Sequence, residues 1–145
     1  MDVLEVLHED HQRVKQLFQQ AQSSGRSDQS RIFEQIREEL ESHARAEEGI
    51  FYPAVQRIGS KAGDAIATAI AQHGDILALI GEIAKAGDNN LNRLEEAVGT
   101  HVKHEENVVF SLAREHLGKN LVDLGQKVKH REEALKAGGQ IAGSE

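Results

Sequence analysis

The chain has 145 residues, of which 39% are hydrophobic, and a formal net charge of −7. This length suits one domain, and the acidic balance argues against a nucleic-acid-binding surface. There is no cysteine, which excludes disulfides, Cys-ligated zinc, iron–sulfur clusters and thiol nucleophiles. No run approaches the roughly 20 apolar residues of a membrane helix and no signal peptide is visible, so we expect a cytoplasmic protein without membrane contact.

Four amphipathic helices are predicted before Gly118. Apolar residues alternate at spacings of three and four, which is the pattern of a helix with one buried face. These apolar seams cover residues 4–18, 33–54, 66–80 and 91–112. Short links rich in Gly, Ser and Asn separate them, and short links favour antiparallel neighbours. The predicted fold is therefore all-α, an up-down-up-down four-helix bundle.

A short additional C-terminal helix is predicted after the bundle. We expect the bundle over residues 1–117, the accessory helix over 118–137 and a flexible tail over 138–145. Within the accessory helix, the basic stretch Lys127–Arg131 is followed by Glu132 and Glu133. Such a mixture of charges is typical of a solvent-exposed helix face.

One pattern of His and Glu occurs twice. His43 and Glu47 stand four residues apart on one predicted helix, and His101 and Glu105 repeat this spacing on another. Residues at this spacing point the same way from a helix. A lone histidine on the preceding helix comes before each pair, so the chain consists of two copies of one unit. Such an internal repeat indicates a two-metal site inside a bundle.

The six repeated residues lie on the apolar seams of their helices, not on the polar faces. They are His11, His43, Glu47, His73, His101 and Glu105. Burying two carboxylates and four imidazoles is costly unless each is paired or bound to a cation. A pair of metal ions is the simplest explanation, and a buried polar network without metal is the alternative.

The ligand types restrict the choice of metal. Imidazole and carboxylate without thiolate suit iron, manganese or, less often, zinc. Two His per ion, two bridging Glu and a solvent-derived oxo or hydroxo bridge leave one position on each ion open or free for a further ligand. Open positions on a redox-active pair predict chemistry with O2, peroxide or NO.

At these residues the chain resembles the hemerythrin-like proteins, also called HHE cation-binding domains. The resemblance spans about residues 1–117 and is most specific at His43–Pro53, where His-x-x-x-Glu-Glu precedes Phe-Tyr-Pro. Further matching segments lie at residues 9–18, 72–76 and 101–110. The resemblance implies a non-haem centre of two iron ions, with the six repeated residues as ligands.

One position departs from the oxygen-carrying members of that family. They have a further histidine one turn after the third-helix histidine, where this chain has Leu77. Without it the two irons are expected to be nearly equivalent, which argues against reversible O2 transport. The departure favours the bacterial hemerythrin-like proteins that consume peroxide or respond to NO or iron.

Tyr52 is the first of two candidate catalytic residues. It lies nominally off the seam, but Gly49 and Pro53 are expected to distort the helix and to turn its phenol toward the metal. The alternative is a tyrosine at the edge of the bundle.

His104 is the second candidate. It stands three residues after His101 and borders the seam, as a further ligand, a proton shuttle or a solvated histidine at the rim. Glu48 and Glu106 directly follow the proposed Glu ligands and point away from the seam by about 100°. They are expected to hydrogen-bond groups around the ligands, or Arg and Lys.

Three functions fit this sequence, in order of preference. The first is a di-iron protein that reacts with peroxide, O2 or NO, by catalase-like disproportionation of peroxide or in a stress response. The second is an O2- or iron-binding or sensing module without catalysis. The third is a structural or zinc-binding bundle without a redox role.

Overall fold

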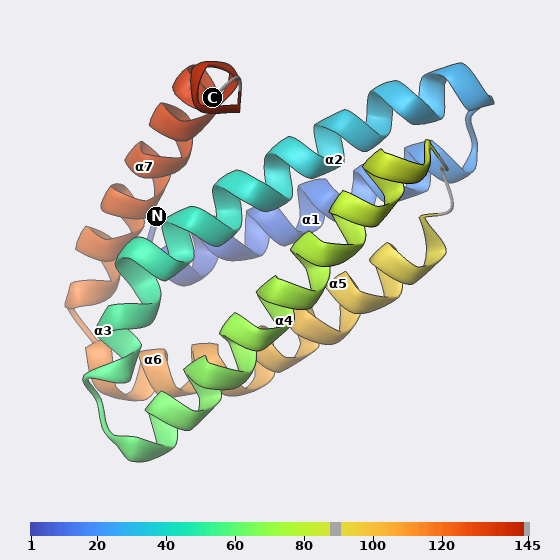
Figure 1. Cartoon of the computed structure of the whole chain (residues 1–145). Coiled ribbons are helices and arrows are strands. Elements are labelled where there is room, and N and C mark those ends of the chain that lie inside the picture. Colours follow the sequence, from blue (N-terminus) through green and yellow to red (C-terminus); the bar gives the residue numbers. More distant parts are fainter. Residues whose placement is uncertain (88–90, 144–145) are drawn as a thin grey trace.

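A computed structural model describes residues 1–87 and 91–143, with side chains up to residue 138. All regular structure in these residues is helical, which confirms the predicted all-α class (Figure 1). In chain order the elements are α1 (Val3–Gln22), α2 (Arg26–Ala46), a π-helical turn η1 (Glu47–Phe51), α3 (Tyr52–Gln56), α4 (Ser60–Ala86), α5 (Asn92–His104), a second π-helical turn η2 (Glu105–Val109), α6 (Phe110–Leu117) and α7 (Asn120–Gly143).

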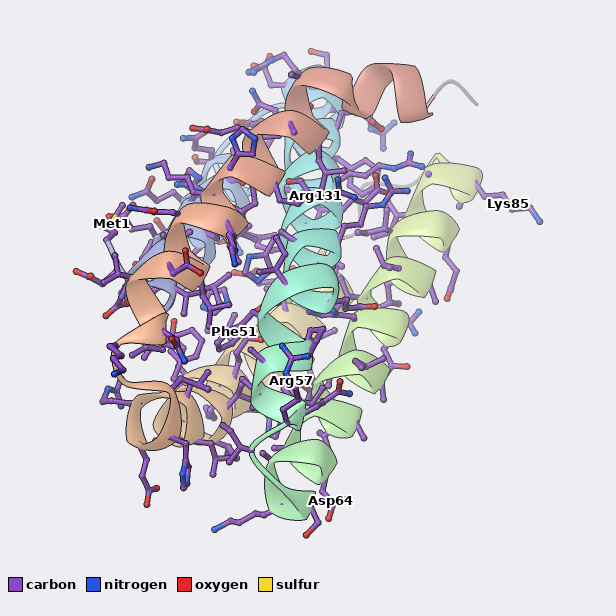
Figure 2. All side chains as sticks on the ribbon, turned by 90° about the vertical axis from the view of Figure 1, so that its left-hand side faces the viewer. Met1, Phe51, Arg57, Asp64, Lys85 and Arg131 are labelled. Atoms are coloured by element: carbon purple, nitrogen blue, oxygen red, sulfur yellow. The ribbon has the colours of Figure 1, made fainter. Side chains whose placement is uncertain are left out.

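These elements form four long helical segments and one added helix. The segments are α1, α2–η1–α3, α4 and α5–η2–α6, and Figure 1 shows the chain turning back on itself after each of the first three. The helix α1 packs on α2, and α4 packs on α5. The helix α7 lies against α1 and α2, and Figure 2 shows it crossing their outer face.

Local sequence explains where the first helix begins and where α4 ends. The Asp2 carboxylate accepts from the Glu5 backbone N–H at 2.9 Å, and the Glu5 carboxylate accepts from the Asp2 N–H at 3.0 Å. This capping box satisfies two N–H groups that an α-helix leaves free. At the end of α4, Gly87 adopts a left-handed conformation with φ 65°, which glycine adopts without a steric penalty.

The buried apolar side chains form two separate clusters. One joins the start of α1 to η1, α3, the start of α4, η2, α6 and α7, with Phe51 and Ile66 fully buried. The other joins the second half of α1 to α2, α4 and α5, with Phe18, Ile36 and Leu94 at its centre. The six repeated residues come from the helical stretches that run between the two clusters, so apolar packing on both sides keeps their layer from water.

The added helix α7 differs from the sequence prediction. It begins at Asn120 and continues to Gly143, beyond the end predicted at residue 137, while residues 144–145 lie outside the described residues. Leu121 and Val128 are buried in the first apolar cluster. The prediction of a solvent-exposed face was wrong at Glu132, which is only 6% exposed.

The helix α4 is long and apolar enough to cross a membrane by length and composition, which the sequence analysis did not expect. Its most apolar window has a mean hydropathy of 1.2 and is 33% buried. This is weak evidence, because the core helix of a bundle passes the same test. The buried face of α4, with Ile66, His73 and Ile76, packs inside the bundle.

Gly125 allows a close approach between α7 and the N-terminus. A Cβ at this position would lie 2.6 Å from the Met1 carbonyl oxygen and 2.8 Å from the Val3 nitrogen, both backbone atoms. We expect Gly125→Ala to destabilise the protein by about 1–3 kcal/mol, because backbone has to move. The helical Gly99 has open space around it, so Gly99→Ala is the control and should stabilise by about 0.5–1 kcal/mol. Urea unfolding followed by circular dichroism measures both, and equal effects would contradict the packing of α7 described here.

Candidate metal centre

The six repeated residues converge in the middle of the bundle, and none is more than 7% exposed. In the first half of the repeat, His11 Nε2 lies 3.0 Å from Glu105 Oε1 and His43 Nε2 lies 2.9 Å from Glu47 Oε1. In the second half, His73 Nε2 lies 3.1 Å from Glu47 Oε1 and His101 Nε2 lies 3.6 Å from Glu105 Oε2. All four imidazoles therefore present Nε2 to the same two carboxylates. We call these six residues the His/Glu cluster.

The opposite nitrogen of every imidazole has a partner of its own. Nδ1 lies 2.7 Å from the Glu106 carboxylate in His11 and 2.8 Å from the Asp10 carboxylate in His43. Nδ1 lies 2.6 Å from the Glu48 carboxylate in His73 and 2.8 Å from the Gln72 amide oxygen in His101. An Nδ1–H that donates to such an acceptor leaves Nε2 as the free lone pair and fixes the ring. We call Asp10, Glu48, Gln72 and Glu106 the outer acceptors.

Both carboxylates of the cluster begin a π-helical turn. Glu47 is the first residue of η1 and Glu105 the first of η2. In a regular α-helix, residues five apart point about 140° away from each other. The wider turn brings the fifth residue onto the same side, so Tyr52 and Phe110 also face the interior and are buried. Such turns are frequent at functional sites.

Tyr52 reaches the centre of the cluster. Its hydroxyl donates to Glu105 Oε2 at 2.5 Å and lies 3.2 Å from both Glu47 Oε1 and His73 Nε2. Its ring stacks on His73, with the centroids 5.3 Å apart. Burial and the negative charges of Glu47 and Glu105 raise the pKa of this phenol. The structure thus places the Tyr52 oxygen among the candidate ligand atoms, where the sequence analysis expected the helix distortion to bring it.

The two halves of the repeat differ at this position. Phe110 occupies the place of Tyr52 in the second copy and stacks on His11, with the centroids 6.1 Å apart. A hydroxyl is thus available beside His73 but not beside His11. The sequence analysis expected two nearly equivalent metal positions, and the structure shows different surroundings for them.

The outer acceptors differ in the same way. Asp10 is a carboxylate, whereas its counterpart Gln72 is a neutral amide. Asp10 also accepts from Arg13, and Glu132 of α7 lies beside Asp10 and His43. Burial raises the pKa of Asp10, but hydrogen bonds with His43 and Glu132 outweigh burial and lower it to about 2. Burial and the neighbouring Asp10 raise the pKa of Glu132 to about 9, so of these two carboxyl groups Glu132 binds a proton more readily than Asp10.

A small apolar pocket adjoins the cluster. About 20 Å³ of it is accessible to the centre of a water-sized molecule, which is enough for roughly one such molecule. All four cluster histidines and Asp10 line it, and its apolar lining is Val14, Leu40, Ala44, Ile76, Leu77, Val98 and Val102. A ligand in this pocket would have the size of O2, NO or peroxide. Leu77, the position at which this chain departs from the oxygen-carrying proteins, thus forms part of the apolar lining.

His104 does not join the cluster. Its Nε2 lies 2.9 Å from the Ala65 carbonyl oxygen and donates to it, so this nitrogen is directed to the backbone of α4. Glu48 and Glu106 were expected to hydrogen-bond groups around the ligands, or Arg and Lys, but each hydrogen-bonds a histidine of the cluster directly. Glu106 also accepts from His8 at 2.8 Å.

A family model described as the hemerythrin HHE cation-binding domain matches residues 2–134. The chain belongs to this family. Among solved structures it is similar to a hemerythrin HHE cation-binding domain-containing protein from Mycobacterium kansasii, with a TM-score of 0.69 and 20% identity. That match covers 97% of this chain and 91% of the other, and at this identity it supports the fold alone. No curated protein matches the chain.

The His/Glu cluster fits the cation binding of this hemerythrin-like family. Glu47 and Glu105 are fully buried, and histidines are the only ion-pair partners that the described residues give them. The buried atoms His43 Nε2 and Glu47 Oε2 have no hydrogen-bond partner among the described residues. Ligand atoms of His43, Glu47, His101 and Glu105 all lie within 4.8 Å of one another. Cations at these atoms would satisfy the orphaned groups and neutralise the buried charge.

Three residues of the centre were not assigned a role from the sequence. Asp10 and Gln72 each directly precede the lone histidine of their half, and this shared position is a pattern that the sequence contains. Asp10 accepts from His43 and Gln72 accepts from His101, so each supports a histidine on the next helix and not the histidine that follows it in the sequence. Glu132 has no such pattern, because it belongs to a helix outside the repeat.

The hydrogen bonds between the outer acceptors and the cluster histidines lead to a prediction about metal affinity. Glu48→Ala removes the acceptor of His73 Nδ1, and we expect it to weaken metal binding by about 10–100-fold, because the imidazole loses its fixed orientation. Competition with a chelator measures the affinity. Glu9→Ala, at an exposed position of α1, is the control and should leave it unchanged. Equal affinities for both variants would show that Glu48 does not support the centre.

Proposed function

We propose that this hemerythrin-like protein is a non-haem di-iron protein that reacts with peroxide, most simply by catalase-like disproportionation. The main support is the convergence of four imidazole Nε2 atoms on two fully buried carboxylates, while all four Nδ1 atoms are engaged elsewhere. His11 and His43 would hold one ion and His73 and His101 the other, with Glu47 and Glu105 shared. The four bundle segments would run up-down-up-down around this centre.

The donor set supports iron as the metal. Two imidazoles per ion with shared carboxylates and no thiolate favour iron or manganese over zinc. The phenol oxygen of Tyr52 adds a hard anionic donor, which suits a ferric ion. An oxo or hydroxo bridge between the ions is part of the proposal, because the two shared carboxylates leave room for a solvent-derived ligand. A cation next to Tyr52 would favour its phenolate form and oppose the effect of the carboxylates on its pKa.

A bound di-iron pair would give two electrons to one H2O2, take two from another and supply Lewis acidity, as the conversion of two H2O2 into two H2O and one O2 requires. The chain itself supplies the other requirements. The apolar pocket beside the histidines admits a ligand of two heavy atoms and keeps bulk water out. The Tyr52 hydroxyl donates a hydrogen bond to Glu105, so when it is not bound to iron Tyr52 is the candidate group for accepting and returning a proton.

The alternative function is an O2- or iron-binding or sensing module without catalysis. One observation favours it, namely that α7 reaches the metal centre through Glu132 and Asp10. A helix that contacts the hydrogen-bond partner of a metal-binding histidine is able to respond to metal loading. In both functions the protein would act in the cytoplasm on small oxidants, with a stress response as the context.

The first test is the metal content of the aerobic protein with its ultraviolet–visible spectrum. We expect about two irons per chain, as in other di-iron bundles, and strong near-ultraviolet absorption from an oxo-bridged pair. Tyr52→Phe should lose any visible phenolate-to-iron band but keep the iron, since Phe is the residue in the matching position 110. A colourless protein that takes up no ferrous iron under anaerobic conditions would refute the di-iron proposal.

The second test is the evolution of O2 from added peroxide. His101→Ala should abolish this activity and reduce the iron content to about one per chain, because one ion keeps both of its imidazoles and the other loses one. His116→Ala, on an exposed side chain of α6, is the matched control and should retain both properties. An iron-loaded protein that is inert to peroxide but binds O2 reversibly would favour the sensing alternative.

A further inference from the structure

The helix α7 contributes a buried acid to the edge of the metal centre. Glu132 is 6% exposed, and its Oε2 lies 3.7 Å from Nδ1 of His43. This oxygen has no hydrogen-bond partner in the part of the chain that the structure describes. Side-chain atoms of Glu132, Asp10 and His43 all lie within 4.8 Å of one another, and Asp10 Oδ2 accepts from His43 Nδ1 at 2.8 Å. Asp10 thus connects α7 to a cluster histidine.

A second contact holds α7 one turn further along. Lys136 Nζ lies 2.7 Å from Glu39 Oε1 of α2. Glu39 Oε2 is in turn 3.6 Å from Arg13 Nε, and Arg13 also pairs with Asp10. Because Glu132 and Lys136 are four residues apart, they lie on the same face of α7. This face therefore bonds to α1 and α2 at the level of Asp10 and His43.

The second half of the repeat lacks this arrangement. Its outer acceptor Gln72 holds His101 through one amide oxygen, and Gln72 lines an open groove between α4 and α5. The helix α7 packs on α1, α2, η1 and α6. Among the described residues, α7 thus covers only the His11–His43 half, although the histidines of the two halves occupy corresponding positions in the repeat.

We propose that Glu132 is a positioning residue through which the docking of α7 controls metal retention in the His11–His43 half of the centre. This inference rests on the proposed metal centre. Glu132 lies against Asp10 and His43 and fixes the carboxylate that orients His43. When α7 moves away, Asp10 loses this support, the imidazole of His43 loses its fixed direction, and the ion in this half is released first.

Rates of metal release test the proposal. The protein is loaded anaerobically with ferrous iron and mixed with excess bipyridine, and the release of each ion is followed by absorbance. Glu132→Leu removes the polar group beside Asp10 at similar size, and we expect one ion to leave about 10–100-fold faster, the usual effect of losing a support behind a ligand. Glu132→Gln keeps a polar side chain of the same shape beside Asp10 and should release both ions at the rates of the unaltered protein.

Two further variants identify the half that responds. Combined with His101→Ala, which weakens the second half, Glu132→Leu should accelerate the release of the remaining ion. Combined with His43→Ala, which weakens the first half, it should leave that rate unchanged. Glu133→Leu, on the exposed side of α7, is the matched control and should have no effect in either background.

Displacement of α7 without any change at the metal centre provides an independent test. Gly125→Ala forces α7 away from the backbone of Met1–Val3 and should also accelerate the release of one ion. Equal acceleration of both ions, or no acceleration in Glu132→Leu, would overturn the inference and leave the di-iron proposal intact. Failure of the unaltered protein to bind iron would instead overturn the proposed function, and this inference with it.

Discussion

Two carboxylates buried without any solvent access are the constraint on which the rest of this molecule depends. Glu47 and Glu105 are 0% exposed and lie between two apolar clusters. A buried, unpaired carboxylate costs several kcal/mol, and the nearest basic groups are imidazoles. Their Nε2 atoms approach the carboxylates because every Nδ1 is already bound to an outer acceptor. A bundle that holds four imidazoles in these orientations is preorganised for cations.

The π-helical turns determine which other side chains reach this layer. Each turn begins at a cluster carboxylate and brings the residue five positions later to the same side, Tyr52 in one half and Phe110 in the other. The outer acceptors differ as well, with Asp10 opposite Gln72. The half beside His73 thus has an additional hydroxyl next to the ligands, and the half beside His43 has an additional negative charge behind a ligand.

The sequence predicted the cluster but only part of its surroundings. Periodicity places Glu47 and His43 on a buried face because an α-helix repeats regularly over that stretch. Tyr52 was expected to move inward because of Gly49 and Pro53, yet η2 makes the same turn with neither residue. The wide turn therefore accompanies the buried carboxylate in both copies. Glu132 was not predicted, because a helix outside the repeat shows its packed face only when the partner helices are known.

The two departures from symmetry, Tyr52 and the contact with α7, fall on different halves, and this bears on how the proposed centre would serve catalysis or sensing. The phenol of Tyr52 is beside His73, where it can exchange a proton with a ligand. The contact from α7 reaches His43, where in our proposal it would link metal retention to the packing of a helix. A change at one ion would therefore not need to disturb the other. The proposed reaction and a response to iron would thus be compatible in one protein, because the features that each requires are held by separate helices.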